Sequence, residues 1–387
     1  MTPMSRIQRL RRDQSGMSYV FIGLSMMAFL SASMLAIDVG MLMTARNQAQ
    51  NSADAGALAG ATALVFDSYT DRTPTGPSVT NALNAARANR VMYGQVSVNP
   101  ADVLFLNDPA GQNDRVKVTV YRQAARGNPV STLIARFFGT ATADIGATAT
   151  AEAAPSNAMT CVKPFTIPDK WREMQTPPWD PDDGFDVVDK KGKPIANPDV
   201  YIGPDDPANY TGYNAYRDAG TQIILKADNG TKIAPSFYQA WDMPGWNGGA
   251  ADYTANIANC NTGVMGYNQV FDAEPGMMTG PTNAGMEALI ARDPGAHWNT
   301  STNRVESTMN PSPRIVAIPL FDPVYYDTGK RQGNNASLKF VNYLGFFIEE
   351  MQGNTVVGRI TPIGGLRKGG MGPAPDVAFP RAIRLVQ

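Results

Sequence analysis

An uncharged apolar run near the N-terminus limits most strongly what this chain can fold into. Residues 17–37 contain no Asp, Glu, Lys or Arg and are rich in Met, Leu, Phe, Ala and Ser. Their length matches the roughly 20 residues that a helix needs to cross a bilayer. Four arginines precede the run and are opposed by one aspartate. The positive-inside rule therefore predicts a cytoplasmic segment at residues 1–16, a transmembrane helix at 17–43 and export of the rest of the chain.

Two other interpretations of this run are open. A cleaved signal peptide also begins with basic residues, and Ser31-Ala32-Ser33 resembles a small-residue cleavage site, although a signal h-region is normally about 7–15 residues long. A buried helix of a soluble protein is the second alternative, but it gives no reason for the arginines. We therefore expect an uncleaved, single-pass anchor.

The helix is expected to continue beyond the apolar run. Residues 44–66 contain no proline and are dominated by alanine, the best helix former. Alanines recur at every fourth position and form one narrow stripe, beside a G-x-x-x-G pair whose small residues let another element approach closely. The stripe comprises Ala45, Ala49, Ala53, Ala57 and Ala61 together with Gly56 and Gly60. The sequence leaves two possible partners for this stripe. It could pack against a helix of another chain, which would allow a homo- or hetero-oligomer, or against the chain's own folded part.

The order of residues through this stretch resembles a known family. The apolar run ends in Ala36-Ile-Asp38, and an Ala-Arg pair and the pattern Asn51-x-Ala-Asp-Ala-x-Ala-Leu-Ala-Gly-Ala follow. This pattern is similar to the N-terminal Tad segment of TadE/TadG-like proteins of Flp (tight-adherence) pilus assembly. The resemblance implies a bacterial inner-membrane protein whose C-terminal part is periplasmic or exposed at the cell surface. Its implied partners are the lipid bilayer and other Tad pilus assembly proteins.

The chain departs from related patterns at two points. Pilins that a prepilin peptidase processes usually carry Glu five residues after the cleavage glycine, whereas Phe21 stands five residues after Gly16. The sequence also lacks the Asp-x-Ser-x-Ser metal motif of the von Willebrand A domain that some TadG proteins carry. The resemblance therefore implies neither peptidase processing nor metal-dependent adhesion.

The exported part is expected to contain two units in an α+β fold. Residues 44–155 combine the long helix with a second helix and a strand in which valines at 116, 118 and 120 alternate with polar residues. A short helix at 132–138 and a strand at 145–153 complete a small pilin-like α+β domain. Residues 156–387 begin with loops dense in Pro, Asp and Gly and then contain four strand-like segments. A β-rich C-terminal domain follows from this pattern.

The only two cysteines, Cys161 and Cys260, both lie beyond the proposed anchor. Isolated thiols usually pair in an oxidising periplasm, so we predict a disulfide. Two separately buried thiols are the alternative. A zinc site would have to use the single histidine, His297, and otherwise unidentified carboxylates.

Residues that could carry chemistry are few. The net charge of −1 gives no basic field for nucleic acid. Carboxylates from Asp180 to Asp189 surround a glycine, which leaves calcium binding and a solvated acidic turn as alternatives, but the spacing does not fit an EF-hand loop. His297 is expected to pack or to form ordinary hydrogen bonds rather than to catalyse. We find no phosphate loop, nucleophile elbow or zinc-protease motif and therefore expect no catalytic, cofactor-binding or metal site.

Three functions from different classes follow. The leading one is a membrane-anchored structural component of pilus assembly that acts through helix packing and protein contacts. The alternative is an exported adhesion or ligand-binding module, such as a minor pilin or surface protein, that uses the tryptophans concentrated after residue 156. The third is a periplasmic enzyme using Asp182 and Asp186, which would need turnover that alanine substitution abolishes.

Overall fold

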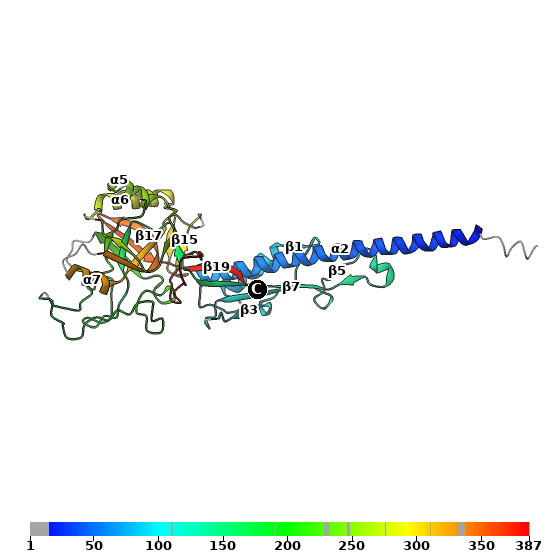
Figure 1. The fold of residues 1–387 in the computed structure, drawn as a ribbon, viewed down its shortest axis with the longest axis horizontal. Helices are drawn as coiled ribbons and strands as arrows, with labels where there is room; N and C mark the ends of the chain where they lie inside the picture. The colour runs from blue at the N-terminus through cyan, green and yellow to red at the C-terminus, as the bar shows by residue number, and fades with distance from the viewer. Residues whose placement is uncertain are drawn as a thin grey trace, which may run out of the picture.

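A computed structural model describes residues 15–109, 111–189, 191–227, 232–245, 248–274, 276–309, 311–331 and 337–386. One long helix projects from a broad body that the C-terminal part of the chain forms (Figure 1). The segment predicted to be cytoplasmic lies outside the described residues except at its last two positions, and Trp246 lies outside them as well.

The long helix is α2 (Ser15–Phe66), which runs without interruption over 52 residues. No proline occurs between Pro3 and Pro74, and alanine supplies much of the second half. At 1.5 Å per residue the helix is about 78 Å long. Its first half extends freely and its second half lies along a sheet (Figure 1). The predicted continuation of the apolar run into one helix is thus confirmed.

The elements that follow α2 lead up to β7 (Ile145–Pro155), the longest strand of the first sheet. They are α3 (Pro77–Ala88), β1 (Arg90–Val91), β2 (Gly94–Gln95), η1 (Pro100–Asp102), β3 (Val103–Leu106), β4 (Arg115–Arg122), η2 (Ala124–Arg126), β5 (Val130–Ser131), η3 (Ala135–Phe138), β6 (Thr142–Ala143) and β7 (Ile145–Pro155). Along β4 half-buried and buried residues alternate, as the valine pattern predicted.

The first sheet is antiparallel and contains the last strand of the chain. Its order is β19–β7–β4–β3, where β19 (Arg381–Val386) pairs with residues 150–155 of β7. Helices α2 and α3 pack on this sheet through a core of alanines and valines. Residues 381–386 fall within the predicted C-terminal unit, but the backbone hydrogen bonds of β19 join them to the sheet of the preceding segment.

The body beyond residue 155 is rich in strands. Its elements are β8 (Ala158–Met159), β9 (Phe165–Pro168), α4 (Ala215–Asp218), β10 (Gln222–Ala227), β11 (Phe237–Ala240), α5 (Ala250–Ala258), β12 (Met265–Gly266), β13 (Gln269–Asp272), α6 (Thr279–Arg292), β14 (His297–Asn299), β15 (Arg304–Glu306), β16 (Ile315–Phe321), α7 (Pro323–Arg331), β17 (Ser337–Gln352) and β18 (Thr355–Ile360). The four strand segments expected from the sequence correspond to β10, β16, β17 and β18.

The main sheet of the body closes on itself. Its strand order is β13–β17–β16–β9–β11–β10–β18, and β18 also pairs with β17, so the ring is barrel-like and β13 remains outside it. Aromatic and branched aliphatic side chains fill the interior. Helices α5 and α6 lie together on one side of the barrel (Figure 1). The overall class is α+β with a β-rich C-terminal region, as predicted.

Candidate functional site in the N-terminal helix

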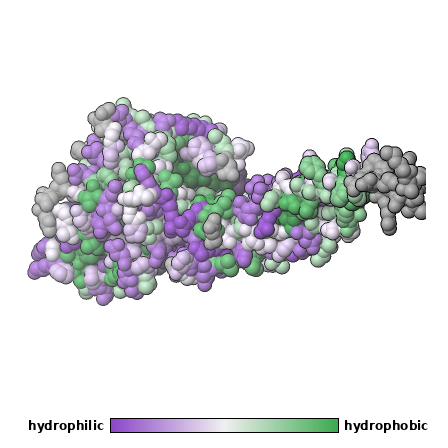
Figure 2. Space-filling model, turned by 45° about the vertical axis from the view of Figure 1, so that its right-hand side comes forward, coloured by the Kyte–Doolittle hydropathy of each residue, from purple (hydrophilic) through white to green (hydrophobic). Residues whose placement is uncertain are grey.

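The first half of α2 exposes apolar side chains along its whole circumference. Among the described residues it is the one helix long and apolar enough to span a membrane, and no part of its most apolar window is buried. Tyr19, Met27 and Phe29 are each exposed by more than two thirds. Figure 2 shows hydrophobic residues covering this projection, whereas the body has a mixed surface. A helix that is apolar all round and uncovered matches a hydrocarbon environment rather than water.

The second half of α2 buries one face against the chain's own sheet. The alanines at positions 45, 49, 53, 57 and 61 are exposed by 1% or less and pack with valines of β4 and alanines of α3 and β7. Small side chains at every fourth position let the helix axis lie close to the sheet. The structure thus gives the stripe an internal partner, which is one of the two alternatives that the sequence left open.

The two glycines beside the stripe lie in close contact with neighbouring elements. A Cβ on Gly56 would lie 3.1 Å from the carbonyl oxygen of Ala82 and 3.2 Å from Cγ1 of Val118. A Cβ on Gly60 would lie 2.8 Å from Cγ1 of Val116. The close approach that the spacing predicted therefore occurs between α2, α3 and β4, within a single chain.

Asp38 marks the point where the free part of α2 meets the folded part. Its carboxylate is 2% exposed and accepts hydrogen bonds from the backbone N–H groups of Leu133 (2.8 Å), Ile134 (3.0 Å) and Ala135 (2.5 Å). These donors stand at the start of η3, where helical N–H groups lack partners within the helix. The carboxylate therefore caps η3 and ties the turn after β5 to α2. No local sequence pattern predicts this contact, because 95 residues separate Asp38 from Leu133.

Replacing Asp38 by alanine is expected to release this turn. Three N–H donors would lose an ionised acceptor, and loss of a capping group costs about 0.5–2 kcal/mol. Amides of residues 133–139 should then exchange with deuterium about tenfold faster in the detergent-solubilised full chain. Asp38→Asn keeps one acceptor oxygen and should fall between the two. Unchanged exchange in Asp38→Ala would refute the capping role.

The acidic loop uses its carboxylates locally. Asp180 accepts the N–H groups of Asp182 and Asp183 at 2.7 and 3.1 Å, and Asp189 accepts those of Lys191 and Lys193. Side-chain oxygens that accept backbone N–H groups two to four residues ahead form turns. Among the described residues no group of three or more His, Cys, Asp or Glu side chains could hold a metal ion. This geometry favours the acidic-turn interpretation.

The other candidate residues lie apart from one another. His297 is 65% exposed at its side chain and faces Glu306 at 3.5 Å. Trp171, Trp241 and Trp298 are buried, and Trp179 packs edge-on against Trp171 with 6.5 Å between ring centroids. The described tryptophans therefore serve the core of the body rather than an exposed ligand-binding face. No contact between His297 and the acidic loop occurs among the described residues.

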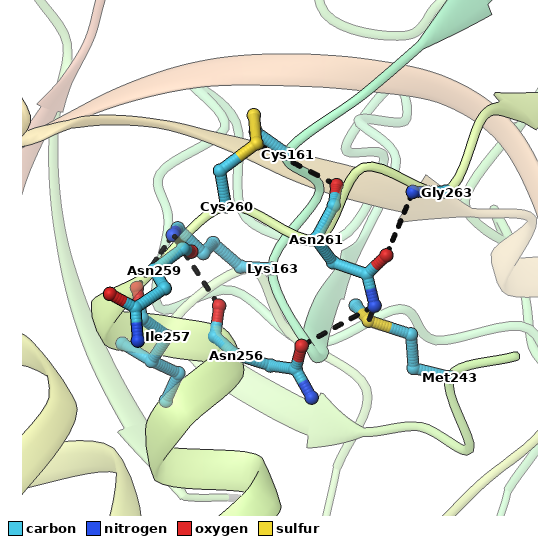
Figure 3. Close-up of a disulfide and its surroundings, with 9 residues drawn as sticks. All are labelled: Cys161, Lys163, Met243, Asn256, Ile257, Asn259, Cys260, Asn261 and Gly263. Atoms are coloured by element: carbon cyan, nitrogen blue, oxygen red, sulfur yellow. Dashed lines mark hydrogen bonds between the residues drawn. A yellow bond between two sulfur atoms is a disulfide. The ribbon is translucent and has the colours of Figure 1, made fainter. Parts of the chain in front are cut away.

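The predicted disulfide between Cys161 and Cys260 is present, with 4.3 Å between the Cα atoms and 99 residues of sequence separation. It joins the segment before β9 to the end of α5, beside Lys163 (Figure 3). Nζ of Lys163 donates to the carbonyl oxygens of Ile257 at 2.5 Å and Asn259 at 2.8 Å. Burial lowers the pKa of Lys163 to about 8. The ammonium group and the disulfide together hold the C-terminus of α5.

A buried carboxylate lies where β19 joins the first sheet. Asp114 is fully buried, and neither oxygen accepts a hydrogen bond from any described residue. Nη1 of Arg381 is 3.9 Å away. Burial is the main cause that raises the pKa of Asp114 to about 7. A free aspartate titrates near 3.9, so the folded state holds a proton at this site that the unfolded state releases between about pH 4 and pH 7.

The pH dependence of stability should reveal this group. Its contribution is fully present below about pH 4 and is lost as the pH rises through 7, because the charged form is disfavoured in the fold. Asp114→Asn is therefore expected to match the wild type near pH 4 and to be more stable by up to about 4 kcal/mol at pH 8, since a pKa raised from about 4 to about 7 disfavours the charged form by that amount and already includes the attraction to Arg381. Denaturant unfolding of the solubilised chain at both pH values measures the difference. The exposed Asp205→Asn variant should show none.

The end of α2 is attached to the body. Nη1 of Arg304 lies 2.7 Å from the Asp67 carboxylate, and a Cβ on Gly364 would lie 3.1 Å from the Phe66 ring. A cavity of about 190 Å³ opens at this junction. Its wall contains one carboxylate and one guanidinium, from Asp67 and Arg381. This lining does not point to a particular ligand.

Comparison with known proteins finds one family model that matches the sequence of this helix. Residues 16–63 match the family model described as "Putative Flp pilus-assembly TadE/G-like". The match includes the exposed apolar half of α2, Asp38 and the buried stripe up to Ala61, and it confirms the resemblance seen in the sequence. No curated protein and no solved structure matches the chain significantly.

Proposed function

We propose that this chain is a membrane-anchored, non-catalytic component of Flp pilus assembly that works through helix packing and protein–protein contacts. The observation that carries the proposal is that the family match coincides with α2. Within that helix the continuous series of exposed large apolar side chains ends at Met43 and the buried alanines begin at Ala45, although Phe66 at the end of the helix is exposed as well. One element therefore combines an uncovered half with a half that is built into the fold.

The proposed topology follows from charge and redox chemistry. Residues 1–16 remain in the cytoplasm, residues 17–43 span the bacterial inner membrane once, and the rest is periplasmic or exposed at the cell surface. The disulfide of the C-terminal body supports export, because such bonds persist in oxidising compartments. We further propose two exported units, 44–155 and 156–387, which share one sheet because β19 pairs with β7.

The proposed partners are the bilayer and other Tad pilus assembly proteins, with no nucleic acid and no cofactor. The stripe from Ala45 to Ala61 is occupied by the chain's own sheet. Any homo- or hetero-oligomer through the N-terminal helix would therefore use the projecting half. In that half, a Cβ added to Gly23 or Gly40 would have no neighbouring heavy atom within 4 Å. Small residues on lipid-exposed helices favour such contacts.

Fractionation of the native host, combined with intact-mass analysis of each fraction, tests the proposal. The expected result is full-length protein in the inner membrane that protease reaches only from the periplasm. Copurification with other pilus assembly proteins should follow from detergent extracts. A shortened form in sheared filaments or in the medium would overturn the anchored assembly role. That result would instead favour the alternative, an exported adhesion or ligand-binding module such as a minor pilin.

A further inference from the structure

The turn that Asp38 holds exposes a compact apolar surface of its own. Leu133, Phe137 and Phe138 are exposed by 51%, 75% and 71%. Most of the other large aromatic side chains of the described chain lie in hydrophobic cores, so this turn differs from the rest of the exported surface. We call residues 132–140 the aromatic turn. Contiguous exposed apolar side chains on a folded element commonly mark a surface that meets another apolar phase.

The aromatic turn lies beside the free half of α2. The hairpin of β5 and β6 runs along the helix, and the turn reaches toward the helix's free end (Figure 1). The contact is fixed by Asp38, whose carboxylate binds the N–H groups at the start of η3. Apolar side chains of α2 around Asp38 are exposed too, among them Leu35 and Met43 at 63% and 66%. The turn and the neighbouring part of the helix therefore both expose apolar side chains.

The position of Asp38 along the helix sets the depth of the turn in a bilayer. From Met17, where the uncharged run begins, to Asp38 the helix rises about 31 Å. The hydrocarbon core of a bilayer is about 30 Å thick. With the start of the run at the inner boundary, Asp38 reaches the outer boundary, and the aromatic turn is level with the outer interface.

The backbone of the aromatic turn is suited to a medium of low polarity. In such a medium each N–H group needs a partner within the protein. Residues whose N–H groups donate either to Asp38 or within the hairpin are Thr132, Leu133, Ile134, Ala135, Phe137, Gly139 and Thr140. The turn therefore exposes side chains to its surroundings while seven of its nine backbone N–H groups have partners within the protein.

The charge on the turn fits a lipid surface. Arg136 is exposed and its guanidinium lies 5.0 Å from the centroid of the Phe137 ring. The turn carries no carboxylate of its own. A cation beside aromatic and aliphatic side chains matches the phosphate groups and the acyl boundary of a leaflet, as in interfacial helices.

We propose that the aromatic turn inserts Leu133, Phe137 and Phe138 into the outer leaflet of the membrane that α2 spans. This inference rests on the proposed membrane anchoring. The turn makes a second contact with the same bilayer, on one side of the helix only. It therefore fixes the rotation of α2 about its axis and the orientation of the exported body above the membrane, which a single spanning helix leaves free.

Quenching of added tryptophans by brominated phosphatidylcholine tests this proposal in the reconstituted full-length chain. Phe137→Trp reports on the turn, with Phe138→Trp as a second variant should the first fail to fold. Phe29→Trp reports on the middle of the proposed spanning segment of α2, and Tyr93→Trp, at a site 93% exposed on the first exported unit, is the aqueous control. The native tryptophans all lie between residues 171 and 298, so subtracting the wild-type signal isolates each added one.

The expected result is a loss of about half the added fluorescence in Phe137→Trp and Phe29→Trp, with none in Tyr93→Trp. Bromine near the headgroups should quench the Phe137→Trp variant more, and bromine deep in the acyl chains should quench the Phe29→Trp variant more. Quenching at position 29 without quenching at 137 or 138 would overturn the inference and leave the anchor intact. Absence of quenching at position 29 would overturn the anchoring and the inference together.

Discussion

The Gly60→Leu substitution is expected to speed amide hydrogen exchange in β4 about a hundredfold, because no space exists for the new side chain between α2 and the sheet. A Cβ on Gly60 already lies 2.8 Å from Cγ1 of Val116 and 3.3 Å from Cβ of Ala82. Leucine carries three carbon atoms beyond that Cβ, so α3 and β4 would have to move away from the helix. Overpacking of a tight core costs about 1–3 kcal/mol and occasionally more.

The same substitution at Gly40 is the matched control. Gly40 lies on the same helix, and a Cβ there would meet no heavy atom within 4 Å. Leucine favours a helix over glycine by about 0.8–1 kcal/mol, so Gly40→Leu should leave exchange in β4 unchanged or slower. Mass spectrometry of the deuterated, detergent-solubilised full chain measures residues 115–122 in both variants. Equal exchange in the two would contradict a packing role for Gly60.

The features that depend on residues close together in the chain could be predicted from the sequence. An uncharged run of bilayer length, an unbroken alanine-rich helix and the alternation of Val116, Val118 and Val120 each follow from neighbouring residues, and the structure contains all three. The stripe could be predicted as a close-packing face for the same reason. Its partner could not, because an alanine face fits a helix of another chain as well as it fits a sheet of its own.

Contacts between distant segments were missed. Asp38 and the residues that it binds in the aromatic turn are 95 or more residues apart, and β19 pairs with β7 across more than 200 residues. Neither segment carries a local pattern that names its partner. A strand at residues 381–386 could have been inferred from Ile383, Leu385 and Val386, but its place in the first sheet depends on backbone hydrogen bonds that any strand can make.

Removing the disulfide by Cys161→Ser and Cys260→Ser together is expected to give the largest loss of stability in the C-terminal body. The bond closes a loop of 99 residues. In the chain-entropy model such a loop contributes up to about 4–5 kcal/mol, and native disulfides typically contribute about 2–4 kcal/mol. We therefore expect the free energy of unfolding to fall by about 2–4 kcal/mol. The Lys163 contacts with α5 should persist, because they do not require the sulfur atoms.

The denaturant dependence distinguishes a cross-link from ordinary packing. Without the bond the unfolded chain expands and exposes more surface, so the slope of unfolding free energy against denaturant should rise while the midpoint falls. Fluorescence of buried Trp171 and Trp241 reports this transition. The wild type in reductant should behave like the double variant, and reductant should not affect the variant. A lower midpoint with an unchanged slope would show that the cysteines stabilise the body by contact at the end of α5 and not by constraining the unfolded chain.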